Sequence, residues 1–388
     1  GTMLVGEGRP FQGTFDGGGH QITNLKVTGE SGYVGLFGYT KGAVIKNCNV
    51  AGEVNGSRYT GGIVGYAGIN THILNCSFQG DVEGTGPYVG GIAGYAGTTL
   101  AGCEVSGCFV TGTVTGEKFV GGIAGWGAGT IKNCYALANV TARTAIAGGI
   151  AGYYCSNFTI ENCYYSGDVL AKNYAGGIAG VMDSTSGSST TIENCVSLAE
   201  SVTAGINSVN RIAGGVRDKI NLINNHSYNR TKLVINGKPA YPTGGEGNDV
   251  IGADVYISNG KVMTDVPNQT LFDWAANGFT KADGWSISGE TGLPYLREDI
   301  TYKLNLSALP SKDLTIDKAP QHFTTRNIGN GFVVKVLSPT ENIGNTPFEV
   351  QYRLHDTTDA WTSAVPNTAG TYDVKITRAA DGDINPFA

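Results

Sequence analysis

The chain has 388 residues, a net charge of −6 and only 15% charged residues, and its basic residues are scattered along its length. Because nucleic-acid binding needs a concentrated positive patch, we expect no nucleic-acid partner. No apolar run approaches the roughly 18 residues of a membrane-spanning helix, so we also expect no membrane span in this chain.

A glycine-rich strand resembling Gly-Gly-Ile-Ala-Gly recurs about every 28 residues, and an Ile-x-Asn-Cys-like strand follows it in each repeat. A fixed period of about 20 to 50 residues indicates a stacked-repeat protein, in which each unit buries its apolar face against its neighbours. The six complete glycine strands contain Gly35–Gly38, Gly62–Gly65, Gly91–Gly94, Gly122–Gly125, Gly149–Gly152 and Gly177–Gly180, and Arg211–Gly214 is a degraded seventh copy.

Each repeat lacks a helical apolar period but contains three short β-branched or glycine-rich runs, for example residues 44–47, 48–54 and 59–66. We therefore predict three strands per coil, with insertions confined to one variable corner. Successive coils would pair in parallel about 4.8 Å apart, so that seven coils form a rod of roughly 35 Å. Since parallel crossovers favour the right-handed turn, the predicted fold class is all-β, a right-handed parallel β-helix (solenoid).

The end of the Ile-x-Asn-Cys element predicts a structural ladder. Equivalent cysteines would lie one above another in the core, and the asparagine amides before them could hydrogen-bond from rung to rung. Gly107 is the one exception in the asparagine column, and His226 is assigned to the last cysteine position. The predicted ladder consists of Cys48, Cys76, Cys108, Cys134, Cys163 and Cys195 and of Asn47, Asn75, Asn133, Asn162, Asn194 and Asn225.

The stacked cysteines are expected to be buried free thiols. Parallel side chains on adjacent rungs keep their Cβ atoms about 4.8 Å apart, farther than the roughly 3.5 to 4.5 Å of a disulfide. A metal site is the alternative, but no Cys-x-x-Cys or His-x-x-x-His spacing supports one, so we predict no metal and no cofactor. Whether Cys103 and Cys155, which lie off the column, are free is left open.

The repeated strand pair, together with the opening sequence Gly13–Ile22, resembles the GLUG repeat family of bacterial surface proteins over residues 11 to about 226. In that family a Gly-Phe, Trp and Leu-Pro-Tyr-Leu sequence closes the solenoid, and Gly278, Trp285 and Leu293–Leu296 are its counterparts here, after a predicted short helix from Pro267 to Ala276. The resemblance implies a β-helix domain over residues 1–300, with a C-terminal cap at about 227–300, from an exported, adhesin-like protein of Bacteroides-type bacteria.

Residues 301–388 form a second predicted domain, because the repeat and all cysteines disappear there. Three runs alternate apolar and polar residues with period 2, namely Phe332–Val336, Phe348–Leu354 and Thr371–Ile376. The sequence 360–372 is similar to bacterial Ig-like modules of the MBG type, so we expect a small β-sandwich that acts as a spacer.

Aromatic residues recur on both sides of the glycine strand, and they are the candidate ligand-binding residues. Strand parity gives the two columns opposite faces, so that one column faces solvent unless the glycines bend the strand. An exposed column could dock sugar rings or a protein, while the alternative is that the rings only stack from rung to rung to stabilise the solenoid. The column after the glycines is Tyr39, Tyr66, Tyr95, Trp126 and Tyr153, and the column before them is Tyr59, Tyr88, Phe119 and Tyr174.

Acidic and histidine residues give no catalytic pattern, so we predict no enzyme and no catalytic residue. The best acidic column contains Glu53, Asp81 and Asp168, of which only the first two lie on neighbouring coils, and we interpret it as a solvated face. A polysaccharide lyase or hydrolase is the alternative that this column leaves. His20 and His72 have no triad-like partner at a recognisable spacing.

We therefore expect a non-enzymatic cell-surface adhesin or scaffold module that presents variable loops on a β-helix rod. The alternative from another class is a carbohydrate-binding module that uses the aromatic column. The expected partner is a host or bacterial surface glycan or protein, and the chain is expected to be a monomer. Low charge and abundant Thr, Asn, Gly and Tyr favour an extracellular, surface-displayed protein whose signal or anchor lies outside this chain.

Overall fold

The computed structural model describes residues 9–30, 32–97, 102–183, 190–217, 220–240, 253–258, 261–265, 270–288 and 293–296, and then isolated strands from residue 303 onward. Only the backbone is described for residues 155–157, 253–258, 261, 265 and the strands after 302. The chain divides into two compact units, one within residues 1–296 and the other within 297–388 together with 19–21. The predicted domain boundary after residue 300 lies outside the described residues.

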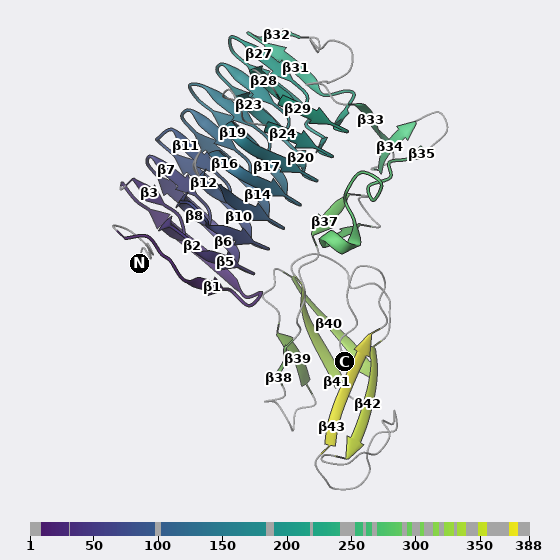
Figure 1. The fold of residues 1–388 in the computed structure, drawn as a ribbon. Helices are drawn as coiled ribbons and strands as arrows, with labels where there is room; N and C mark the ends of the chain where they lie inside the picture. The colour runs from purple at the N-terminus through teal and green to yellow at the C-terminus, as the bar shows by residue number, and fades with distance from the viewer. Residues whose placement is uncertain are drawn as a thin grey trace. The chain divides into compact units, whose positions relative to one another are not determined.

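The first unit is an all-β, right-handed parallel β-solenoid of about seven turns, as the repeat period predicted (Figure 1). Three sheets run along the solenoid, and each coil contributes to all three. The coils pair in parallel, while the hairpin pairs at residues 234–239 and 256–271 are antiparallel. Successive coils pair in register, so that Tyr88 lies beside Tyr59 in one neighbouring coil and beside Phe119 in the other. Equivalent residues of the repeat therefore form straight columns.

The three sheets, which we call A, B and C, contain different numbers of strands. Sheet C consists of β3 (Tyr33–Val34), β7 (Tyr59–Gly61), β11 (Tyr88–Gly90), β15 (Phe119–Gly121), β18 (Ile146–Gly148), β22 (Tyr174–Gly176) and β27 (Ser208–Asn210). Sheet A consists of β1 (Thr14–Asp16), β4 (Phe37–Thr40), β5 (Val44–Lys46), β8 (Val64–Ala67), β9 (His72–Leu74), β12 (Ala93–Ala96), β13 (Cys103–Ser106), β16 (Ala124–Lys132), β19 (Ala151–Glu161), β23 (Ala179–Asp183), β24 (Thr190–Glu193), β28 (Ala213–Arg217) and β29 (Ile220–Ile223). Sheet B consists of β2 (Gln21–Thr28), β6 (Asn49–Gly56), β10 (Ser77–Gly84), β14 (Phe109–Gly116), β17 (Tyr135–Ala142), β20 (Tyr164–Ser166), β21 (Asp168–Ala171), β25 (Val196–Ser197), β26 (Ser201–Ala204), β30 (His226–Tyr228), β31 (Lys232–Ile235), β32 (Lys238–Pro239), β33 (Ala253–Ser258), β34 (Lys261–Asp265) and β35 (Thr270–Leu271).

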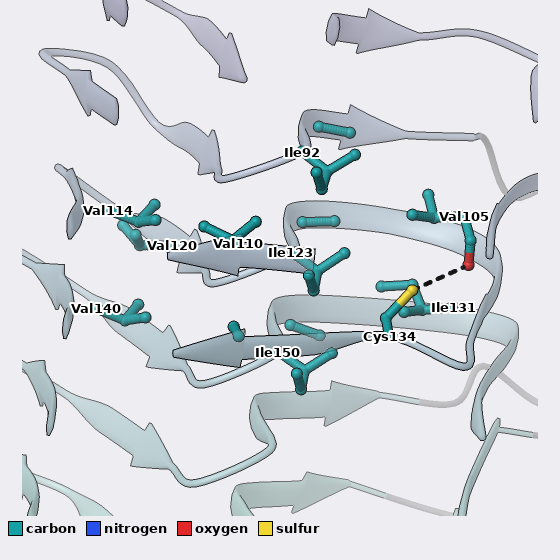
Figure 2. Close-up of a cluster of buried hydrophobic side chains, with 14 of the residues drawn as sticks. Ile92, Val105, Val110, Val114, Val120, Ile123, Ile131, Cys134, Val140 and Ile150 are labelled. Carbon is teal, nitrogen blue, oxygen red and sulfur yellow. Dashed lines mark hydrogen bonds between the residues drawn. The ribbon is translucent and has the colours of Figure 1, made fainter. Parts of the chain in front are cut away.

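The interior of the solenoid is filled by columns of small and β-branched side chains. Figure 2 shows one such column, Ile92, Ile123 and Ile150, and each of these residues is 0% exposed. The cysteines form a neighbouring column, in which the Cys134 thiol donates to Val105 O at 3.6 Å in the coil before. Seven cysteines are free and buried, Cys103 among them. The side chain of Cys155 lies outside the described part of the chain.

The asparagine before each cysteine lies at a corner with left-handed backbone geometry. Asn47, Asn75 and Asn133 have φ of 51° to 52°, and Gly107, the exception in the column, has φ of 65°. Asparagine and glycine tolerate this conformation better than other residues, which explains why these two types occupy the column. Amides also hydrogen-bond between rungs, as from Asn162 Nδ2 to Asn133 Oδ1 at 3.3 Å.

The last coil corrects the predicted ladder by one residue. Register pairs Val196 with His226, so Asn224 takes the corner position with φ of 50° and Asn225 takes the cysteine position. The Asn225 amide makes the two bonds that a thiol makes elsewhere, since it accepts from Cys195 N at 3.0 Å and donates to Ile192 O at 2.9 Å. The prediction that His226 occupies the cysteine column is therefore wrong. His226 lies one residue beyond that position, on the outer face.

Arg211 replaces a glycine of the repeat in the last coil, and the stacking explains why only this coil accepts it. A Cβ at Gly177 would lie 2.1 Å from Arg211 O in the coil above. The strand that precedes Arg211, β27, is the end strand of sheet C, so the same constraint is absent there. The Arg211 side chain is 8% exposed and donates from Nη1 to Tyr228 O at 3.4 Å across the end of the coil.

The described residues of 272–296, which we call the strap, run back along the outer face of sheet B. Trp285 packs on Tyr135 and Tyr164, with ring centroids 6.0 and 6.1 Å apart, while Phe272 packs on His226 at 4.9 Å. In the coils that the strap covers, the residue directly after the cysteine position is aromatic or apolar. The strap contains the short 3₁₀ helix η1 (Lys281–Asp283) and the hairpin of β36 (Trp285–Ile287) and β37 (Pro294–Leu296).

The described part of the predicted helix from Pro267 to Ala276 is not helical. Residues 270–271 form β35, and residues 274–278 form a turn. Phe272 and Trp274, each 4% exposed, both pack into the apolar cluster between the strap and sheet B. They are two positions apart, which is an extended spacing and not a helical one. Gly278 has φ of 92°, and a Cβ there would lie 2.1 Å from Asn162 Oδ1, so it permits close approach of the strap to the coils.

The second unit contains six described strands, three of which match the predicted runs. They are β38 (Lys303–Asn305), β39 (Asp313–Asp317), β40 (His322–Gly329), β41 (Phe332–Ser338), β42 (Phe348–Leu354) and β43 (Tyr372–Arg378), arranged in a sheet of order β38-β39-β41-β40 and a β42-β43 pair. The described residues of all three alternating runs are strands, as predicted, and Thr371 lies outside the described residues. The Ig-like sandwich stays a prediction.

The corner geometry predicts different stabilities for two substitutions of Asn75. Asn75→Gly should change the free energy of unfolding by less than about 0.5 kcal/mol, whereas Asn75→Ala should lower it by about 1 to 2 kcal/mol because alanine strains at positive φ. Chemical denaturation followed by circular dichroism measures both. The account of the corners would be wrong if the two variants were equally stable.

The cysteine column predicts thiols that do not react in the folded protein. Burial raises the pKa of the Cys76 thiol and raises that of Cys103 to about 12, so these two residues carry little thiolate at neutral pH. Burial also keeps a reagent away from every cysteine of the column. In a Cys155→Ser variant, a colorimetric thiol reagent at pH 8 should detect no rapidly reacting group until denaturant is added. Fast labelling of the native variant would contradict the buried column.

Candidate functional site

The main surface feature of the solenoid is a strip of aromatic rings at the corner between sheets C and A. Its members are half-exposed, and each contacts at least one other ring of the set over five successive coils. We call this set the aromatic strip. It consists of Tyr33, Tyr39, Tyr59, Tyr66, Tyr88, Tyr95, Phe119, Trp126 and Tyr153.

Two kinds of contact hold the strip together. Within the columns most neighbouring rings stack nearly parallel, as Tyr66 on Tyr95 at 4.7 Å and 9°, although Tyr39 meets Tyr66 edge to face at 84°. Between the columns most rings meet edge to face, as Tyr59 on Tyr66 at 5.1 Å and 87°. Both arrangements are favoured by the ring quadrupole. The nine rings therefore form one rigid surface.

Glycines at the corner bring the two columns onto the same surface. Tyr59 precedes the corner and Tyr66 follows it, while Ile63 and Val64 between them are both 0% exposed. Two consecutive inward residues show that the alternation of a straight strand is broken there. A Cβ at Gly65 would lie 2.9 Å from Tyr59 O, so only glycine permits so tight a corner.

The five predicted ligand-binding residues all lie in the aromatic strip. Sequence parity placed the column of Tyr59 on the opposite face from that of Tyr66, and the structure shows that both columns face outward. The prediction failed on this point because it treated residues 59–66 as one straight strand. The glycines at positions 61, 62 and 65 are the sequence signal for the bend.

Stacking decides which part of each ring a ligand can reach. The face of an inner ring such as Tyr88 is covered by Tyr59 at 5.0 Å on one side and by Phe119 at 5.5 Å on the other. The half-exposed part is therefore the ring edge with its hydroxyl. A sugar could not lie flat on these inner rings, so the strip differs from an open aromatic platform.

The electrostatics of the strip favour hydrogen-bond donors. Burial and the neighbouring Tyr39 and Tyr59 raise the pKa of Tyr66 to about 12, so its phenol stays protonated at neutral pH. The Arg58 guanidinium carbon lies 5.1 Å from the centroid of the Tyr59 ring. Lys118 occupies the position of Arg58 two coils further on, and both cations are exposed.

The acidic column lies on the outer face of sheet B, away from the strip, and its members are hydrogen-bonded to their neighbours. Thr113 donates to Asp81 at 2.6 Å, Ser201 donates to Asp168 at 2.7 Å, and Lys26 pairs with Glu53 at 3.5 Å. These carboxylates are exposed and follow the solenoid axis. This arrangement supports the interpretation as a solvated face.

The histidines have structural surroundings where they are described. His72 Nδ1 lies 2.9 Å from Glu104, which also pairs with Lys132 at 2.9 Å, so both partners hold the pKa of Glu104 below its usual value. His226 contacts Asn277 at 2.8 Å, and burial lowers its pKa. In the described part of the chain, no three His, Cys, Asp or Glu side chains gather as metal ligands would.

The fold and the strip define a class of protein, a parallel β-solenoid built from glycine-cornered repeats. The family model described as the GLUG motif matches residues 56–83 and 85–115, which are adjacent repeats of this solenoid. These residues of the chain are therefore GLUG motif repeats, as the sequence resemblance implied.

A solved structure from Bacteroides ovatus, described as "a putative immunoglobulin A1 protease", is similar to this chain at 24% identity. The likeness covers 73% of this chain and 76% of that one, with a TM-score of 0.47. The comparison with curated proteins gives no match. Among the described residues, none forms a helix with the length and apolarity that crossing a membrane requires.

The stacked rings predict a stability difference between two variants of Tyr66. Tyr66→Ala removes contacts with Tyr39, Tyr59 and Tyr95 and should lower the free energy of unfolding by about 2 kcal/mol. Tyr66→Phe retains the ring and should stay within about 0.5 kcal/mol of the parent. Denaturant melts of the full chain provide the measurement, and equal losses in both variants would assign the effect to the hydroxyl instead of the stack.

Proposed function

We propose that this chain is a non-enzymatic, extracellular surface module that binds a partner through the aromatic strip. The observation that carries the proposal is the half-exposure of nine contiguous aromatic rings on one rigid surface. Tyrosine, tryptophan and arginine are the residues that contribute most to binding surfaces, because they offer a large contact area and lose little conformational freedom. Such a module acts as an adhesin or scaffold.

The solenoid supplies the rigid support that this function needs. Every ring of the strip is carried on a strand, or directly beside one, that pairs with the equivalent strands of its neighbours. The surface is therefore organised before the partner arrives, which reduces the entropy cost of binding. The variable corner, which was expected to present loops, includes residues 98–101 and 184–189, which lie outside the described residues.

The arrangement of the acidic residues supports a non-enzymatic role over a polysaccharide lyase or hydrolase. Such enzymes need two or three carboxyl groups that converge on one bond. Here Asp81 and Asp168 accept hydrogen bonds from neighbouring rungs on an exposed sheet face. Release of reducing ends or unsaturated products from a polysaccharide panel would overturn this part of the proposal.

The proposal also assigns a role to the second unit and a localisation to the protein. We assign residues 301–388 the role of an Ig-like spacer, supported by the alternating strands β41, β42 and β43. The extracellular surface is supported by the low fraction of charged residues and by the GLUG repeats. The carbohydrate-binding alternative uses the same strip and differs only in the partner.

A steric block placed beside the strip tests where the partner binds. Lys118→Cys and, as the matched control, Lys232→Cys on sheet B would each be made in a Cys155→Ser background and coupled to a polyethylene glycol maleimide. The full chain would then be screened against bacterial cells, host-matrix proteins and a glycan array. Modification at position 118 should abolish binding by blocking the rings, whereas modification at position 232 should leave it unchanged.

The proposal fails if modification at position 118 leaves every interaction intact, or if both modified proteins lose binding equally. Comparison with the unmodified variants separates the steric effect from the loss of a lysine. Thermal melts of all four proteins establish that each is folded.

A further inference from the structure

The size of the aromatic strip indicates the shape of its ligand; this inference rests on the proposed function. Five coils at about 4.8 Å per rung give a length of roughly 20 Å, and the strip is only two ring columns wide. A stable interface between folded proteins covers about 800 Å² on each partner, which is several times the area of such a strip. An elongated ligand lying along the solenoid axis fits this area better than a globular one.

The inner strands of the strip leave no edge for an extended peptide. β7 pairs with β3 and β11, and β8 pairs with β4 and β12, so both sides of β7 and β8 are occupied. Among the strands that carry the strip, β3 and β4 of the first coil are the end strands. A peptide therefore could not add as a further strand beside the inner rings. Its side chains would also repeat about every 6.8 Å on one face, which does not match the rung spacing of about 4.8 Å. A linear chain of sugar rings, with a shorter repeat and many oxygen atoms, matches better.

The chemistry of the strip indicates the charge of that ligand. Ring edges carry the positive end of the aromatic quadrupole, and the protonated phenols are donors. Three exposed cations, Lys41, Arg58 and Lys118, flank the rings. Of the neighbouring carboxylates, Glu117 pairs with Arg143 at 3.6 Å, and Glu30 is exposed in the first coil. Asp183 accepts a hydrogen bond from the Tyr153 hydroxyl at 2.7 Å and pairs with Arg217 at 3.8 Å. The strip and its flanks thus present more donors and positive charge than acceptors.

We propose that the aromatic strip binds a linear anionic polysaccharide, carboxylated or sulfated, laid along the solenoid axis. The sugar hydroxyls and ring oxygens would accept hydrogen bonds from the tyrosine hydroxyls along the ring edges. The acidic groups would pair with Arg58 and Lys118, which stand two rungs apart. This mode needs no exposed ring face, and it is therefore compatible with the observed stacking.

The test compares matched pairs of polysaccharides. Binding of the full chain to immobilised polygalacturonate, to its methyl ester, to heparin and to desulfated heparin would be measured at low and at physiological salt. We expect binding to polygalacturonate, to heparin or to both, at least tenfold weaker binding to the corresponding uncharged or desulfated form, and weaker binding at higher salt. The two acidic polymers distinguish a carboxylate from a sulfate as the recognised group.

Variants then locate the interaction. Arg58→Gln and Lys118→Gln should each weaken binding about threefold, as expected for one exposed ion pair. Lys232→Gln, the control away from the strip, should have no effect. A triple Tyr59→Phe, Tyr66→Phe, Tyr88→Phe variant keeps the stacked rings and removes the donors, so its binding should fall while its thermal stability is retained.

Several results would overturn the proposal. Equal binding to charged and neutral forms would remove the role of the anion, and full binding by the double Arg58→Gln, Lys118→Gln variant would place the ligand elsewhere. Tighter binding to poly-glutamate than to either acidic polysaccharide would make the partner an acidic polypeptide. If no polysaccharide binds but modification at position 118 still blocks attachment to cells or proteins, this inference fails and the proposed function stands.

Discussion

The structure depends on the close approach of successive coils at the corner of the glycine strand. A Cβ at Gly62, Gly91 or Gly122 would lie 2.1 to 2.3 Å from a carbonyl oxygen of the next coil. Real Cβ atoms do not approach oxygen so closely, and the corner therefore accepts only glycine wherever another coil lies above it. This one constraint fixes the register of the columns, the outward direction of the aromatic rings and the exception at Arg211.

The same constraint connects the fold to the proposed function. Because the chain turns sharply between Tyr59 and Tyr66, rings from two strands of one coil meet on the outside. Because coils stack in register, rings at equivalent positions of neighbouring coils also stack, as Tyr59 on Tyr88 and Tyr66 on Tyr95. The same aromatic residues thus serve both stability and the proposed binding. The ring faces stack on neighbouring rings, and the ring edges are available to a partner.

Much of the fold could be predicted from the sequence because the repeat makes local patterns reliable. The period, the three strands per coil and the parallel pairing follow from residues that recur in register. The cysteine column follows from the same recurrence, and the structure places six of its members there. The position of Asn225 was missed because the rule used, an asparagine before the cysteine or its replacement, fits both Asn224 and Asn225. The spacing from Leu222 would have decided it.

The rest required tertiary information. Parity arguments hold only within a straight strand, so they could not show that Tyr59 and Tyr66 share a surface. The position of the strap could not be predicted from local sequence patterns, because Phe272 and Trp274 pack on coils that are distant in sequence. The sequence around their contact residues, such as Tyr164, also does not indicate that another segment buries them. In both cases, contacts between distant segments set the outcome.

The most direct test of the account is oxidative footprinting of tyrosine side chains by mass spectrometry, with the full chain free and bound to the cell surface or polysaccharide that retains it. The account predicts that binding protects Tyr59, Tyr66 and Tyr88, while the half-buried Tyr228 of the far coil keeps the same reactivity. Unchanged reactivity of all three strip tyrosines on binding, with protection elsewhere on the solenoid, would contradict it.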